Sequence, residues 1–158
     1  MHYTMKSQCP RTITTDSVTT GTGCTKISVT ATLHGLVLNS LIGGGSKWEI
    51  YDASLKFRIK YKLTSSSTWS YSSYCTAKTC TWQESYTNTI SQSVSSGNYD
   101  VAVEMYVTYT GSVKTITLPA NTSLEPYETF IDTDSIICNR GSTSNLATGT
   151  LNYIAIGR

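Results

Sequence analysis

The most regular stretch of the chain is residues 50–63, where apolar and polar side chains alternate one by one. The apolar positions of this stretch hold Tyr51, Ala53, Leu55, Phe57, Ile59, Tyr61 and Leu63. The polar positions include a basic stripe of Lys56, Arg58, Lys60 and Lys62. Alternation with a period of two over this length predicts a strand with one buried and one solvated face.

Two other segments, residues 26–38 and 99–110, alternate in the same way. In the first of these, the alternation shifts by one step at Gly35, which is typical of a β-bulge. Gly111 and Ser112 predict a turn after the second segment. Further strands are predicted in residues 113–118, 129–138 and 149–158. No segment has a convincing helical pattern.

The composition supports an all-β fold, since Thr, Ser, Tyr, Val and Ile are abundant and charged residues make up only 14%. Many short strands with short turns favour an antiparallel two-sheet sandwich, either immunoglobulin-like or jelly-roll. We expect residues 25–158 to form one such domain. Residues 1–24 predict an extended N-terminal arm that pairs with a sheet edge, in its own domain or in a neighbouring copy.

Two short motifs resemble known families. The motif "SSGNYDVAVEMYVTY" resembles a strand pair of immunoglobulin-like and fibronectin type III modules. This resemblance covers about 60 residues and implies a fold class rather than a function. The C-terminal "GTLNYIAIGR" resembles the closing strand of some phage fibre and virion proteins, which implies a structural role in a virion.

Residues 68–86 concentrate aromatic side chains and two cysteines, and predict a hairpin closed by Thr76–Thr79. If Cys75 and Cys80 face each other, strand alternation places four rings on their side. These rings are Trp69, Tyr71, Trp82 and Tyr86. The face they form either packs on the opposite sheet or presents an aromatic platform for sugar rings or a protein partner. A Cys75–Cys80 disulfide is possible, and an odd total of five cysteines leaves at least one unpaired.

Catalytic and metal-binding patterns are scarce. The two histidines, His2 and His34, belong to no triad motif, and no G-x-S-x-G sequence occurs. We therefore predict no enzymatic activity and no cofactor. Asp132 and Asp134, with Glu125 or Glu128, offer oxygen ligands for Ca²⁺, but a solvated strand face is the preferred interpretation and no metal site is predicted.

Charge and hydropathy narrow the range of partners. A net charge of +2 gives no reason to expect nucleic-acid binding, although the basic stripe could hold an anionic glycan. We favour instead a solubilising face, or one paired with acidic residues. No apolar run approaches the roughly 18 residues of a membrane span. The first twelve residues lack the apolar region of a secretory signal, and Asn121 begins a glycosylation sequon.

Two functional hypotheses follow. The first is a structural protein of a virion or surface assembly, such as a capsid decoration, tail or fibre component. Its partners would be copies of itself or other proteins of the assembly, and its location the virion or an extracellular surface. The second is a secreted module that binds a surface glycan or a protein through the predicted aromatic face.

Overall fold

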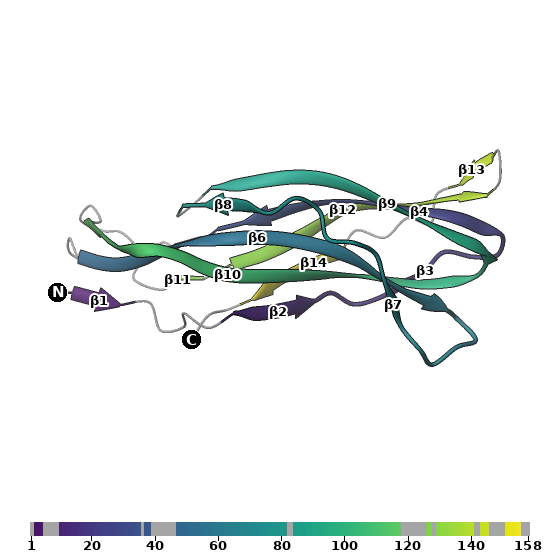
Figure 1. The fold of residues 1–158 in the computed structure, drawn as a ribbon, viewed down its shortest axis with the longest axis horizontal. Coiled ribbons are helices and arrows are strands. Elements are labelled where there is room, and N and C mark those ends of the chain that lie inside the picture. Colours follow the sequence, from purple (N-terminus) through teal and green to yellow (C-terminus); the bar gives the residue numbers. More distant parts are fainter. Residues whose placement is uncertain are drawn as a thin grey trace.

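The protein is an all-β sandwich of two sheets packed against each other, as the sequence predicts (Figure 1). The computed structural model describes residues 2–4, 10–35, 37–38, 47–81, 84–117, 126–127, 129–140, 143–145 and 151–155. The described residues form strands and no helix, so they include no helical segment that could cross a membrane.

The first sheet is built around two long neighbouring strands, β6 (Lys47–Leu63) and β10 (Tyr99–Thr117), which run antiparallel. Strands β2 (Arg11–Thr14) and β3 (Val18–Thr19) add to the other edge of β10. The free side of β6 takes β1 (His2–Thr4), which is parallel, and the antiparallel β7 (Ser70–Tyr71) and β8 (Lys78–Cys80).

The second sheet is antiparallel and centres on β4 (Cys24–His34) and β12 (Thr129–Arg140). Strand β9 (Ser85–Gly97) pairs with β4, and β13 (Thr143–Asn145) and β14 (Leu151–Ala155) pair with β12. A separate short ladder joins β5 (Val37–Leu38) to β11 (Pro126–Tyr127).

The core lies between the inner faces of the two sheets, and it confirms the predicted alternation. On β6, Leu55, Phe57 and Ile59 are fully buried, while the basic residues between them are not. The inner face of β4 contributes Ile27, Val29, Ala31 and Leu33 to the same cluster. Each large apolar side chain that leaves water here stabilises the fold by about 1.5–3 kcal/mol.

The described strands of the N-terminal arm pair with their own chain, the first of the two alternatives: β1 pairs with β6, and β2 and β3 pair with β10. Ile13 lies opposite Met105, and its side chain is buried. Where β2 and β3 are interrupted, the Thr15 hydroxyl accepts a hydrogen bond from the Val103 amide at 2.9 Å. The Thr20 hydroxyl does the same for the Tyr99 amide at 3.0 Å. Side-chain oxygens thus replace missing backbone acceptors at this edge.

Two local predictions are wrong. The turn expected at residues 111–112 does not occur, because β10 continues through it with a register shift between Thr110 and Lys114. The bulge expected at Gly35 is instead the end of β4, where the Gly35 amide donates to the Glu84 carbonyl at 2.7 Å. A Cβ at this position would lie 2.5 Å from the Thr81 carbonyl oxygen, so the close approach of the two chains requires glycine.

Candidate functional site

The hairpin predicted for residues 68–86 does not form. Both of its predicted arms pair with β6, with Tyr71 opposite Lys60 and Cys80 opposite Ala53. Between these two ladders, the Cys75 amide donates to the Phe57 carbonyl at 2.9 Å. Residues 70–80 therefore run once along the edge of β6 instead of folding back on themselves.

This path separates Cys75 and Cys80, the two cysteines of the possible disulfide. Cys75 lies against Phe57 and Cys80 lies opposite Ala53, four residues further along β6. At about 3.3 Å per residue the separation is about 13 Å, beyond the roughly 7 Å limit between bridged Cα atoms. Both are free, buried thiols, and burial raises the pKa of Cys80.

The expected aromatic face is also not assembled. Trp69 and Tyr71 lie on the outer side of the first sheet, but Tyr86 of β9 points inward between the sheets. The Tyr86 hydroxyl lies 3.0 Å from the carbonyl oxygens of both Leu55 and Thr76. Burial, together with a hydrogen bond to Cys75, raises the pKa of Tyr86. Trp82 lies outside the described residues.

The structure instead places aromatic rings over the basic stripe. Charged groups lie 4.4 Å from the ring centre for Lys56 on Tyr74, 4.0 Å for Arg58 on Tyr71 and 4.6 Å for Lys60 on Trp69. Lys62 also lies 5.3 Å from the Trp69 ring. Cations over ring faces at these distances are attracted by the ring quadrupole. The two features that the sequence showed separately thus form one surface, the cation–aromatic face.

Carboxylates of β10 complete the cation–aromatic face. Glu104 lies opposite Arg58, accepts a hydrogen bond from its Nε at 2.8 Å and forms an ion pair with its Nη2 at 2.6 Å. Asp100 lies opposite Lys62 and accepts from its Nζ at 2.9 Å. The hydrogen bond from Lys62 lowers the pKa of Asp100. The prediction that acidic residues pair with the stripe is confirmed for these two of its four cations.

The outer face of the second sheet carries a row of hydroxyls, with Lys26 at one end of the row and His34 at the other. Three cross-strand pairs between β4 and β9 have oxygens 2.7 Å apart: Ser28 with Ser91, Thr30 with Thr89, and Thr32 with Thr87. We call these three pairs the hydroxyl ladder. It extends towards β12, where Thr32 donates to the Asp134 carboxylate at 2.8 Å.

Asp132 and Asp134, two of the acidic residues considered for Ca²⁺, lie on this same face. The Asp132 carboxylate lies 3.1 Å from His34 Nε2, and the Asp134 carboxylate accepts a hydrogen bond from Thr32. Within the described residues, no three His, Cys, Asp or Glu side chains gather as metal ligands do. Glu125 and Glu128, as well as the sequon at Asn121, lie outside the described residues.

Strand β9 forms an edge of the second sheet. Its thirteen residues include no charged residue and no proline, and its solvated positions hold only serine and threonine. It pairs with β4 in unbroken register from Lys26 opposite Ser93 to His34 opposite Ser85. In the described part of the chain, no strand pairs with the opposite edge of β9.

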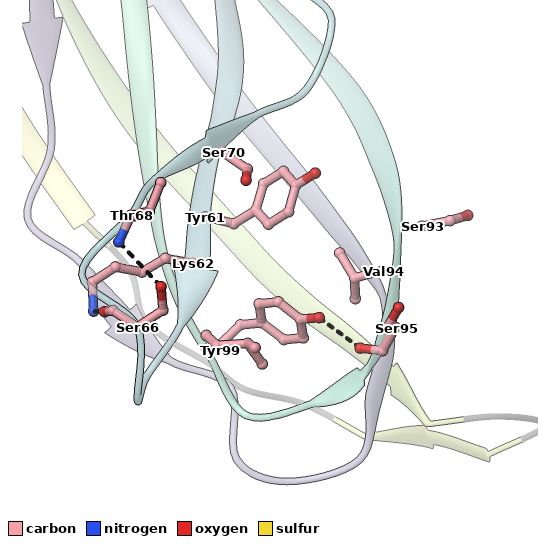
Figure 2. Close-up of a pocket in the computed structure, with 10 residues that line it drawn as sticks. Tyr61, Lys62, Ser66, Thr68, Ser70, Ser93, Val94, Ser95 and Tyr99 are labelled. Carbon is pink, nitrogen blue, oxygen red and sulfur yellow. Dashed lines mark hydrogen bonds between the residues drawn. The ribbon is translucent and has the colours of Figure 1, made fainter.

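A pocket of about 440 Å³ opens between β6 and β9 at one end of the sandwich (Figure 2). Its described lining is rich in hydroxyl groups: Tyr61, Lys62, Leu63, Ser66, Thr68, Ser70, Ser93, Val94, Ser95 and Tyr99. The rings of Tyr61 and Tyr99 meet edge to face with centres 6.1 Å apart. The alternation assigned both tyrosines to core positions. The pocket could not be predicted from it, because the pocket depends on how β9 lies relative to the end of β6.

Comparisons of the chain with protein-family models, with curated proteins and with solved structures find no match. Functional inference therefore rests on the surfaces described above.

Proposed function

We propose that the protein is a non-enzymatic structural component of a virion or surface assembly, such as a capsid decoration, tail or fibre protein, whose copies join through β9. The observation that carries this proposal is the long, uncharged edge of β9. Strand edges present unpaired amides and carbonyls, and natural proteins usually protect them with lysine, proline, bulges or short strands. Residues 85–97 contain no lysine or proline, and the one register irregularity against β4 lies beyond Ser93, so residues 85–93 form a regular stretch.

The other described edges differ from β9. The β7–β8 edge is interrupted over residues 72–77 and lies beside the cation–aromatic face. The β2–β3 edge is interrupted over residues 15–17. Only β9 offers, among the described edges, a single strand of thirteen residues, about 40 Å long. This contrast favours β9 as the joining edge.

A second copy of the chain fits this edge chemically. In an antiparallel pair of β9 strands related by a two-fold axis at Ser91, Thr89 would face Ser93 of the other copy. Hydroxyl would thus meet hydroxyl, as it does between β9 and β4 within the chain. No like charges would oppose each other across the axis, and such opposition is the usual obstacle to self-pairing.

The alternative, a carbohydrate- or protein-binding module, was argued from an aromatic face whose described members do not lie together. Of the three described members of that face, Tyr86 points into the sandwich and Trp69 and Tyr71 are engaged with cations.

The test is the mass in solution, measured by sedimentation velocity over a range of protein concentrations. The double variant Thr89→Lys/Ser91→Lys places two charges on the β9 edge. Its matched control, Ser28→Lys/Thr30→Lys, places the same charges on the same face but on the central strand β4.

We expect the unmodified chain and the control to associate and the edge variant to remain monomeric. Chemical denaturation of each protein checks that the fold survives. An unmodified chain that stays monomeric at every concentration, or an edge variant that associates like the control, would contradict the proposal.

A further inference from the structure

The pocket between β6 and β9 combines ring surfaces with several hydroxyl groups. Figure 2 shows the rings of Tyr61 and Tyr99 projecting from neighbouring strands towards Val94 of β9. Tyr99 is almost fully buried and its hydroxyl donates to the Ser95 carbonyl at 2.6 Å, which fixes its ring. Tyr61 is half-buried, so part of its ring surface faces the opening.

Three hydroxyls of the pocket are available for a ligand among the described residues. Within the described residues, the side-chain hydroxyls of Tyr61, Thr68 and Ser70 make no hydrogen bond. Each can both donate and accept. Hydroxyls around an apolar ring surface suit a ligand that has apolar faces and many hydroxyl groups at its rim.

The only charged side chain in the described lining is already neutralised. Lys62 donates to the Asp100 carboxylate and to the Ser66 carbonyl, each at 2.9 Å. The ammonium therefore has an opposite charge in direct contact and adds little attraction for an anion. The pocket chemistry thus favours a neutral ligand.

The size of the pocket is consistent with a small ligand. Its volume of about 440 Å³ lies in the lower part of the range of roughly 300–1,000 Å³ that small-molecule sites occupy. Val94 and the exposed Leu63 add apolar surface at its sides.

We propose that this pocket is a binding site for a neutral pyranose sugar. The apolar C–H face of the sugar ring lies against the Tyr61 ring, and its hydroxyls exchange hydrogen bonds with Tyr61, Thr68 and Ser70. The Tyr61 ring and the three hydroxyls come from β6 and the segment after it, whereas β9 lines the pocket with Ser93, Val94 and Ser95, so the pocket adjoins the proposed edge contact.

Saturation-transfer NMR with methyl α-glucoside, methyl α-mannoside and methyl β-galactoside tests this site. Glucuronate serves as the charged comparison and sorbitol as the open-chain comparison. We expect transfer to at least one of the three glycosides and much weaker transfer to both comparisons. If no glycoside receives transfer, or if glucuronate or sorbitol binds as strongly, the proposal is wrong.

Substitutions then locate the site. Ser70→Trp fills the pocket and should weaken binding at least tenfold, whereas Ser67→Trp, an exposed position in the same segment outside the lining, should leave it unchanged. Tyr61→Phe keeps the ring and removes one hydrogen bond, which corresponds to a loss of about 2- to 10-fold. Binding that survives Ser70→Trp, or that is lost equally in Ser67→Trp, would overturn the assignment.

The same titration in the Thr89→Lys/Ser91→Lys variant separates this proposal from the assembly. Sugar binding that persists in a monomeric edge variant supports the pocket irrespective of the edge contact. If the edge variant is monomeric and no longer binds the sugar, the sugar site is not formed by one chain alone and the pocket assignment is wrong.

Discussion

The outer faces of the two sheets obey the same alternation but are built from different chemistry. On the first sheet, long cationic side chains lie across aromatic rings and reach carboxylates of β10, so the surface is covered by its own side chains. On the second sheet, the short side chains of the hydroxyl ladder reach only the adjacent strand. On the first face, long side chains and aromatic rings cover the sheet. On the second face, the side chains of the hydroxyl ladder are too short to cover the backbone of the β9 edge.

This difference shows how two solvated faces can serve different roles. Long side chains can cover a neighbouring ring and exclude a partner, and their stems bury apolar surface. A flat face of hydroxyls next to an uncharged edge leaves backbone groups within reach of another chain. The predictions below test the core that the two faces share and then each face in turn.

The largest effect is expected beneath the first face. Phe57 is fully buried at the centre of β6, and Phe57→Ala should lower the free energy of unfolding by about 3–5 kcal/mol. Lys60→Ala, on the opposite side of the same strand, should cost less than about 1 kcal/mol, since it loses a ring contact. Equal losses in chemical denaturation would disprove the assignment of inner and outer faces.

The ion pair of Arg58 and Glu104 should have the next largest effect. Glu104 is largely buried and accepts a charge-assisted hydrogen bond from Arg58 within an ion pair, so Glu104→Gln should cost about 1.5–3 kcal/mol. A double-mutant cycle with Arg58→Met measures the coupling itself. A coupling near zero would show that the cation–aromatic face is held together by its rings alone.

The pair of Lys62 and Asp100 predicts a pH dependence. The hydrogen bond from Lys62 lowers the folded-state pKa of Asp100 below its unfolded value. The pair therefore stabilises the fold above about pH 4. This contribution is lost as the pH falls through the folded-state pKa of Asp100. The unmodified chain should therefore lose more stability than Lys62→Met between about pH 5 and 2. If the melting temperatures of the two proteins fall by the same amount over this pH range, the pairing is refuted.

The hydroxyl ladder should show the smallest effect. The Thr30 and Thr89 hydroxyls are 2.7 Å apart on an exposed face, and a cycle of Thr30→Val and Thr89→Val should give a coupling of about 0.2–1 kcal/mol. Because neither group is charged, this coupling should not change with salt, whereas that of Arg58 with Glu104 should fall. If the coupling free energy of Thr30 and Thr89 changed with salt as that of Arg58 and Glu104 does, the two faces would not differ as described.

Much of the fold could be predicted from the sequence, because alternation alone separates inner from outer residues. Phe57 and Lys60 were assigned to their correct faces in this way. The path of residues 68–81 could not be predicted, since no local pattern distinguishes a hairpin from an edge strand that follows β6. The assumption that Cys75 and Cys80 pair then fixed a wrong register.

The candidate sites were predictable only in part. The basic stripe was evident, but Tyr74 and Glu104 joined it through contacts with distant segments. The alternation assigned Tyr61 and Tyr99 to the buried face of their strands. It does not show that Tyr61, near the end of β6, stays partly exposed. Which sheet edge lacks a partner follows from strand order, and sequence alone does not give that order.

The most direct test of the central claim is amide hydrogen exchange of β9 as a function of protein concentration. If copies join through β9, protection within residues 85–97 should rise as the protein associates, while the amides of the β7–β8 edge should exchange at an unchanged rate. If association leaves the β9 amides unprotected, or protects those of the β7–β8 edge instead, copies do not join through β9 and the proposal is wrong.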